Sequence, residues 1–174
     1  MLKTFYSKWR SWRQNRLFRY AFDLLVLILF VIGIRAYTMR DMTSGIAPQI
    51  QNKTLQGQLV DLHQTDKRPV LLHFWASWCP ICSLEQDSIE ALSKDYNVIT
   101  IAMQSGENNE VRQHLKDNQL TFTVINDPDG LISQSYGIRG VPSSFIIDNN
   151  NLIRFAESGF TTGVGLRLRL WLAK

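Results

Sequence analysis

Two cysteines separated by two residues carry the clearest chemical signal in this sequence. The segment Cys79-Pro80-Ile81-Cys82 holds both cysteines of the chain and follows the apolar run Val70–Phe74. A C-x-x-C pair between a strand and a helix is the arrangement of a thiol–disulfide redox site. At a helix start, backbone N–H groups and the helix dipole stabilise the thiolate of the first cysteine. Pro80 suits the first turn, where its missing N–H costs no hydrogen bond.

Two other uses of the cysteine pair remain open at this point. A structural zinc site needs four ligands, and His63, His73 and His114 are not spaced as a second ligand pair. A purely structural disulfide is the other alternative, but a bond across two residues closes a short loop and constrains the unfolded chain little. We therefore expect a redox-active disulfide, no metal ion and no organic cofactor.

The basic residues are concentrated at the N-terminus. Residues 1–40 carry eight Lys or Arg against one Asp, a balance of +7, whereas residues 41–174 carry eleven Lys or Arg against fourteen Asp or Glu, a balance of −3. Because the larger part of the chain is acidic, the composition does not indicate nucleic-acid binding.

An apolar run follows this basic segment. Extended from Tyr20 to Tyr37, it approaches the roughly 20 residues that span a bilayer. The basic excess before it predicts a cytoplasmic N-terminus and an exported remainder. A cleaved signal peptide is the alternative, although the basic region is long and no clear cleavage site follows. We expect a basic cytoplasmic segment at 1–19, an uncleaved transmembrane anchor at 20–37, a linker at 38–52 and one domain at 53–174.

Hydrophobic periodicity and turn signals predict an α/β sheet in this domain. The expected elements are a hairpin at 54–62 around Gly57, strands at 70–75, 98–103 and 122–125, helices at 79–93, 107–118 and 131–136, and a final hairpin of strands 144–147 and 152–157. The tail at 166–172 is ambiguous, because Leu alternates with Arg as in a strand although such tails are commonly helical.

Two separate motifs resemble the thioredoxin superfamily. Phe74–Cys82 resembles its active-site segment, and Tyr136–Pro142 resembles its cis-proline loop. Glu85 and the segment Ser143–Asp148 are similar to the TlpA-like branch, which includes membrane-tethered periplasmic reductases of cytochrome c maturation and the copper-tolerance-associated ScsD type. The resemblance covers residues 48–174. It implies a thioredoxin-like fold with a central mixed sheet, and a periplasmic domain on a single-pass inner-membrane anchor.

The resemblance also implies roles for individual residues. Cys79 would be the attacking thiolate and Cys82 the resolving thiol, with Trp78 and Pro80 shaping the site. Pro142 would follow a cis peptide bond, and the backbone of Val141 would pair with a substrate strand.

Two titratable residues are candidates for proton transfer. His73 stands where many superfamily members carry a buried Asp or Glu, so it could serve as a base or tune the thiols. An ordinary core histidine is the alternative. Glu85 is the second candidate, with a solvated first-turn acid as its alternative.

The expected activity is dithiol–disulfide exchange with exported cysteine-containing proteins, more as a reductant, supplied by a membrane partner of the thiol-redox type. A thiol-dependent peroxidase of the AhpC/TSA type is a rival, but Pro80 follows Cys79, whereas the peroxidase motif has its proline before the cysteine. A copper-binding module is another, because two thiolates can hold Cu(I), but no Met or His cluster supports it.

Overall fold

The computed structural model describes residues 16–65 and 68–174, and the chain divides into two compact units at Arg40 and Asp41. The first unit contains helix α2 (Arg16–Met39). Its stretch Arg19–Met39 has 21 residues with a mean hydropathy of 2.0, long and apolar enough to cross a membrane by length and composition. The expected basic segment at 1–19 lies almost wholly outside the described residues.

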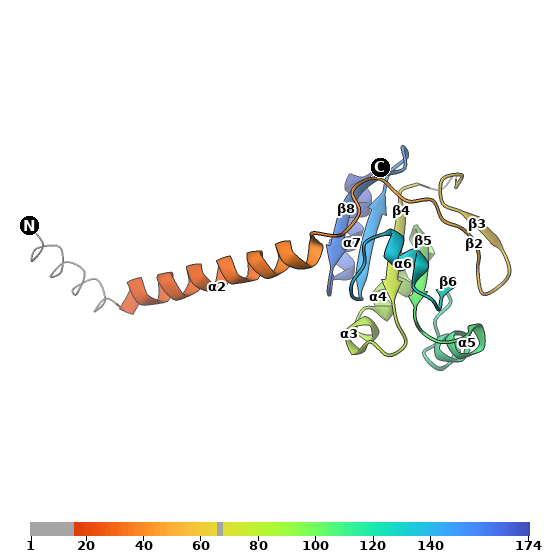
Figure 1. Cartoon of the computed structure of the whole chain (residues 1–174), viewed down its shortest axis with the longest axis horizontal. Helices are drawn as coiled ribbons and strands as arrows, with labels where there is room; N and C mark the ends of the chain where they lie inside the picture. The colour runs from red at the N-terminus through yellow and green to blue at the C-terminus, as the bar shows by residue number, and fades with distance from the viewer. Residues whose placement is uncertain (1–15, 66–67) are drawn as a thin grey trace, which may run out of the picture. The chain divides into compact units, whose positions relative to one another are not determined.

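The second unit is built on a six-stranded mixed sheet with the strand order β1-β8-β7-β4-β5-β6. Figure 1 labels β8, β4, β5 and β6 of this sheet. Strands β4, β5 and β6 are parallel, whereas β7 and β8 run antiparallel to their neighbours and β1 pairs antiparallel with β8. The strands are β1 (Gly45–Ile46), β4 (Val70–Trp75), β5 (Asn97–Met103), β6 (Thr123–Asp127), β7 (Ser143–Ile147) and β8 (Leu152–Ser158).

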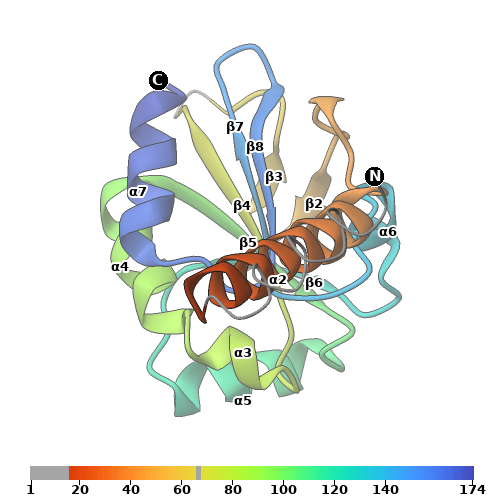
Figure 2. The ribbon, with the colours of Figure 1, turned by 90° about the vertical axis from the view of Figure 1, so that its left-hand side faces the viewer.

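Helices cover both faces of this sheet, as Figure 2 shows with α4 and α7 on one side and α6 on the other. A small hairpin of β2 (Gln51–Lys53) and β3 (Leu59–Asp61) lies beside the sheet, with Gly57 at a positive φ of 83° in its turn. The helices are α3 (Pro80–Ser83), α4 (Gln86–Asp95), α5 (Asn108–Asp117), α6 (Leu131–Ser135) and α7 (Gly163–Leu172).

Strand β4 is the centre of the core, and all six of its residues are buried. Successive side chains point to opposite faces of a sheet. Leu71 and Trp75 accordingly pack with α4, α5 and α7, whereas Leu72 and Phe74 pack with α6 and the opposite layer. The near-continuous apolar run therefore makes a strand buried on both faces, and alternation places His73 on the α4 side.

Several expected boundaries differ from the structure. The hairpin expected at 54–62 has its two strands at Gln51–Lys53 and Leu59–Asp61. The segment 38–52, expected as a linker, contains β1 and the start of β2, and the Thr43 N–H donates to the carbonyl of Tyr136. The helix expected at 79–93 is broken into α3 and α4, because the N–H groups of Leu84 and Glu85 bond to carbonyls three residues back rather than four. The ambiguous tail is helix α7.

Candidate active site

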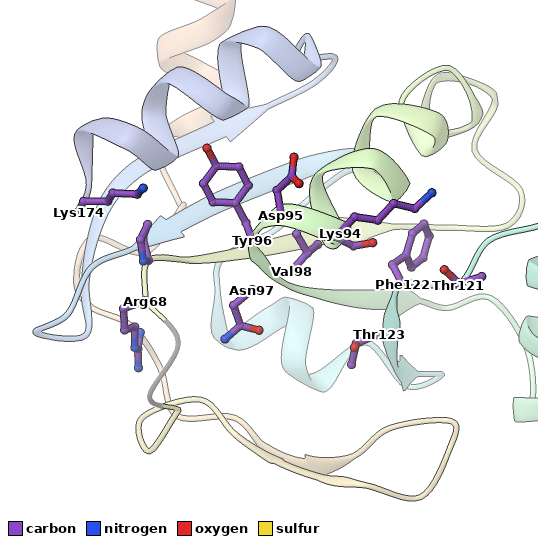
Figure 3. A pocket seen from close by; sticks show the side chains of 12 residues that line it. Arg68, Lys94, Asp95, Tyr96, Asn97, Val98, Thr121, Phe122, Thr123 and Lys174 are labelled. Carbon is purple, nitrogen blue, oxygen red and sulfur yellow. The ribbon is translucent and has the colours of Figure 1, made fainter.

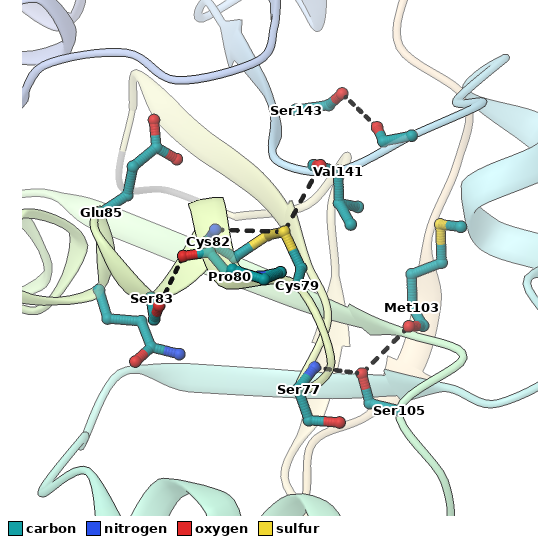
Figure 4. Close-up of a disulfide and its surroundings, with 12 residues drawn as sticks. Ser77, Cys79, Pro80, Cys82, Ser83, Glu85, Met103, Ser105, Val141 and Ser143 are labelled. Atoms are coloured by element: carbon teal, nitrogen blue, oxygen red, sulfur yellow. Dashed lines mark hydrogen bonds between the residues drawn. A yellow bond between two sulfur atoms is a disulfide. The ribbon is translucent and has the colours of Figure 1, made fainter.

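The two cysteines form a disulfide at the start of α3, with their Cα atoms 5.3 Å apart (Figure 4). Cys79 is the N-cap residue, and its Sγ accepts a hydrogen bond of 3.1 Å from the backbone N–H of Cys82. Pro80 occupies the first turn. Because α3 has only four residues, this N–H contributes more to stabilising a thiolate than a helix macrodipole would.

Accessibility differs between the two sulfur-bearing residues. Cys79 is 7% exposed and Cys82 is 1% exposed. An incoming disulfide therefore has a path to Cys79 before Cys82.

The loop before β7 lies against the disulfide from the other side. The Val141–Pro142 peptide bond is cis, in agreement with the expected cis-proline loop. Sγ of Cys79 lies 3.6 Å from the carbonyl oxygen of Val141. Figure 4 shows this carbonyl directed at the sulfur. A loop that begins about 60 residues later in the chain thus forms the second wall of the site.

A third segment holds the loop between β4 and α3 in place. The indole N–H of Trp78 donates to the carbonyl of Gln104 at 2.9 Å, and the backbone N–H of Ser77 donates to Oγ of Ser105 at 3.0 Å. The Ser105 hydroxyl in turn donates to the carbonyl of Met103. Gln104 and Ser105 were not among the predicted site residues. Their position directly after the buried strand β5 is the signal that could have found them.

The residues around the α3–α4 break reverse the usual distribution of polarity. Ile81 and Leu84 are 49% and 72% exposed, whereas the polar Glu85 and Gln86 are buried at 2% and 7%. A solvated first-turn acid was the alternative expected for Glu85, and it is wrong, because the break turns Glu85 toward the core.

Glu85 is held inside by one backbone donor. Its Oε1 accepts a hydrogen bond from the backbone N–H of Thr161, in the segment between β8 and α7. Burial raises the pKa of Glu85 to about 7, and the hydrogen bond from Thr161 opposes this shift. A carboxyl group with this pKa can accept and release a proton near neutral pH.

His73 is buried beside this carboxyl group. Its Nε2 lies 3.9 Å from Oε2 of Glu85, and its Nδ1 lies 2.9 Å from Oγ of Ser144. Burial lowers the pKa of His73 to about 4, so the ring is neutral at physiological pH. The two residues that the sequence offered as separate candidates therefore form one pair. Ser144 and Thr161, which complete it, were not among the predicted site residues.

Other features of the domain lie away from the disulfide. A polar hollow of about 720 Å³ is found at the opposite end of the parallel strands, where Arg68, Asn97 and Thr123 are among its lining residues (Figure 3). Within residues 16–65 and 68–174, no group of three or more His, Cys, Asp or Glu is placed to hold a metal ion.

Known proteins are similar to this chain in sequence and in fold. The redoxin family model matches residues 42–163. A thioredoxin-like protein of Haemophilus influenzae is 27% identical over 162 residues, covering 92% of this chain and 96% of the relative. The thiol:disulfide interchange protein DsbE of Vibrio cholerae is 27% identical over 151 residues, covering 78% of this chain and 82% of the relative.

A solved structure shows the same fold. The crystal structure of a putative DsbE from Chlorobium tepidum superimposes with a TM-score of 0.65 at 26% identity, covering 75% of this chain and 96% of the other. Several of these relatives are named as thiol:disulfide interchange proteins, which agrees with the disulfide described above. The chain belongs to the redoxin family and, within it, to the thioredoxin-like, TlpA-like branch of protein-disulfide oxidoreductases.

Proposed function

We propose that this protein is a membrane-anchored reductase of disulfides in exported proteins, with Cys79 as nucleophile and Cys82 as resolving thiol. The observation that carries the proposal is the position of Cys79. Its sulfur caps α3, accepts the Cys82 N–H and lies 3.6 Å from the Val141 carbonyl. A thiolate formed there keeps a hydrogen-bond donor, and a substrate strand can pair with the adjacent Val141 backbone.

The reaction needs two exchange steps. The Cys79 thiolate attacks one sulfur of a substrate disulfide, so that a mixed disulfide forms and one substrate thiolate leaves. Cys82 then loses its proton and attacks Sγ of Cys79, which forms the Cys79–Cys82 bond and releases the second substrate thiolate. Two electrons pass from the protein to the substrate, and a second dithiol must later reduce the protein again.

Glu85 is the base that we propose for the second step. Its carboxyl group is buried in the first turn after Cys82 and has its pKa near 7, so it can be ionised near neutral pH and take up the Cys82 proton. His73 stays neutral beside it and acts on the carboxyl group rather than as the proton acceptor. Trp78, clamped to Gln104, shapes the entrance to Cys79.

The N-terminal helix supports the location that we propose. The apolar stretch Arg19–Met39, together with the preceding basic residues, supports a single-pass inner-membrane anchor with residues 1–19 in the cytoplasm and the domain in the periplasm. Partners would be exported cysteine-containing proteins on one side and a membrane thiol-redox donor on the other. The redox centre itself supplies the chemistry, so we propose no further cofactor.

Trapping experiments test the roles of the cysteines and the direction of electron flow. Alkylation of intact cells should find Cys79 and Cys82 mostly as free thiols, and a mostly oxidised pair would refute the reductase assignment. Cys82→Ala should accumulate mixed disulfides through Cys79, with the double Cys79→Ala/Cys82→Ala variant as control. If Cys79→Ala traps partners and Cys82→Ala does not, the two roles are reversed.

Topology is tested separately. A reporter fused after Lys174 should be active only if it is one that folds outside the cytoplasm. Activity of a reporter that works only in the cytoplasm would contradict the proposed orientation.

A further inference from the structure

A row of polar side chains crosses the otherwise apolar sheet face beneath α4 and α7. In this row, Thr100 of β5, His73 of β4, Ser144 of β7 and Glu157 of β8 are in register with their neighbours. Thr100 accepts a hydrogen bond from the Trp75 indole, and Glu157 forms an ion pair with Arg169 at 2.8 Å. Between these two, the Ser144 hydroxyl lies against Nδ1 of His73.

The hydrogen bonds in this row point to one tautomer of His73. In a neutral imidazole, one nitrogen donates and the other accepts. Across the part of the chain that the structure describes, the Ser144 hydroxyl has one hydrogen-bond partner, Nδ1 of His73. If Nδ1 carried the proton, this buried hydroxyl would have no acceptor, which is costly. The lone pair of Nε2 would then face the Glu85 carboxylate. The opposite assignment satisfies both groups, because Ser144 donates to Nδ1 and Nε2–H faces Glu85.

We propose that Ser144 is a positioning residue that holds His73 as its Nε2–H tautomer and so keeps a hydrogen-bond donor directed at Glu85. The proposal rests on the proposed function of Glu85 as the base for Cys82. The separation of 3.9 Å between Nε2 and Oε2 exceeds a hydrogen bond, and a movement of roughly 1 Å by either side chain would close it. Such a donor favours the ionised carboxylate, which is the form that accepts the Cys82 proton.

The other groups that face this pair do not supply the same donor. The Thr161 N–H binds Oε1, the oxygen atom that does not face His73. Arg169 of α7 is paired with Glu157. His114 of α5 lies against Gln86 at 2.9 Å, and burial lowers its pKa. Cys82 on α3 is the proton donor of the reaction. His73 is therefore the group that can donate a further hydrogen bond to the Glu85 carboxylate. Ser144 determines which nitrogen atom of His73 carries the proton for that bond.

The tautomer can be read directly by NMR. In the full-length reduced protein with ¹⁵N-labelled histidine, in detergent micelles at neutral pH, the His73 signals are identified by their loss in His73→Leu. The expected spectrum has Nε2 protonated and Nδ1 unprotonated. A protonated Nδ1 would overturn the proposal, whatever the kinetics show.

The kinetic consequence is a displaced pH profile. Reaction of the reduced protein with Ellman's reagent releases one thionitrobenzoate when Cys79 attacks and a second when Cys82 resolves the adduct. We expect Ser144→Ala to move the pH midpoint of the second phase upward by about one unit, because the carboxylate loses an oriented donor. Ser144→Thr keeps the hydroxyl and should retain the original midpoint.

Two controls separate the possible failures. Ser133→Ala removes another buried serine hydroxyl, which donates to Asp127, and should leave the midpoint unchanged. If Ser144→Ala slows the second phase equally at every pH, Ser144 has only a structural role and the proposal is wrong. If Glu85→Gln keeps the original midpoint, Glu85 is not the base. That result removes the proposed function of Glu85 and with it the kinetic role of Ser144, while the NMR spectrum still decides the tautomer.

Discussion

Helices α5 and α3 both begin with a side-chain acceptor, but they differ in whether the residues that follow bury apolar or polar side chains. At α5, Glu107 and Glu110 form a reciprocal capping box, and Val111 and Leu115 are buried. At α3, the sulfur of Cys79 is the cap, Ile81 and Leu84 are exposed, and the next turn buries Glu85. Helix α5 thus satisfies its ends and buries its apolar stripe as a stable helix does.

The difference between the two helix starts indicates that the α3 region has features that cost stability and support reactivity. The Cys79 sulfur that caps α3 can change between disulfide and thiolate, whereas a carboxylate cap has no such redox chemistry. A buried carboxyl group is costly, but burial brings its pKa near 7, where proton transfer is efficient. Exposed apolar residues beside Cys79 offer a partner protein a surface to contact.

The largest expected effect comes from the buried carboxyl group near α3. Glu85→Gln should slow resolution of the mixed disulfide by about 10²- to 10⁴-fold, the usual contribution of a general base. The matched change in α5, Glu110→Gln, should leave that rate unchanged. Single-turnover release of thionitrobenzoate measures both. Equal rates in the two variants would mean that the two acidic residues do not differ in function.

The apolar residues of the two helices should respond in opposite ways to truncation. Leu115→Ala, at a 7% exposed position, should lower the free energy of unfolding by about 2–5 kcal/mol. Leu84→Ala, at a 72% exposed position, should change it by less than about 0.5 kcal/mol. Denaturant titration of the oxidised protein measures both. A large loss in Leu84→Ala would show that the exposed face of α3 is needed for folding.

The pH dependence of the free energy of unfolding should reflect the shifted pKa values of the buried Glu85 and His73. The folded protein keeps the Glu85 proton between pH 4.5 and about 7, so this group lowers stability as pH rises through that range. His73 stays neutral from pH 6.5 down to about 4, so this group lowers stability as pH falls. Where the ranges overlap, the two slopes oppose each other.

If one residue of the Glu85–His73 pair is replaced, the free energy of unfolding should vary with pH as the remaining residue dictates. Glu85→Gln keeps the His73 contribution, so its free energy of unfolding should increase as pH rises from about 4 to 6.5, at up to about 1.4 kcal/mol per pH unit. His73→Leu should lose stability with rising pH from 4.5 to about 7. Denaturation midpoints across this pH range test both slopes, and parallel curves for all three proteins would contradict the pKa shifts.

At the α5 cap we expect a smaller loss of stability than at the buried Leu115. Glu107→Ala should lower the free energy of unfolding by about 0.5–2 kcal/mol. The loss should be the same in the oxidised and the reduced protein, because the capping box joins residues of the α5 N-terminus only. Denaturation in the presence and absence of a reductant compares the two states. A loss that depended on redox state would mean that α5 is coupled to the disulfide.

Much of the fold was predictable because its signals are local. Strand β4, helix α5 and the β7–β8 hairpin agree with the sequence analysis, since each depends on the periodicity of a few neighbouring residues. The segment expected as a linker was not predictable in this way. Strand β1 exists because its two residues pair with Ile153 and Leu152 of β8. A local sequence pattern does not predict a partner more than 100 residues away.

The same distinction holds for the active site. The sequence by itself determined the Cys79–Cys82 pair and its place after β4, because adjacency along the chain brings the two sulfur atoms together. Only the tertiary structure decided the surroundings of Glu85. The break after α3 turns its carboxyl group inward, β4 brings His73 beside it, and the pairing of β7 with β4 brings Ser144 against that ring. Burial by these three elements sets the pKa of the carboxyl group, and burial is a property of the packed chain.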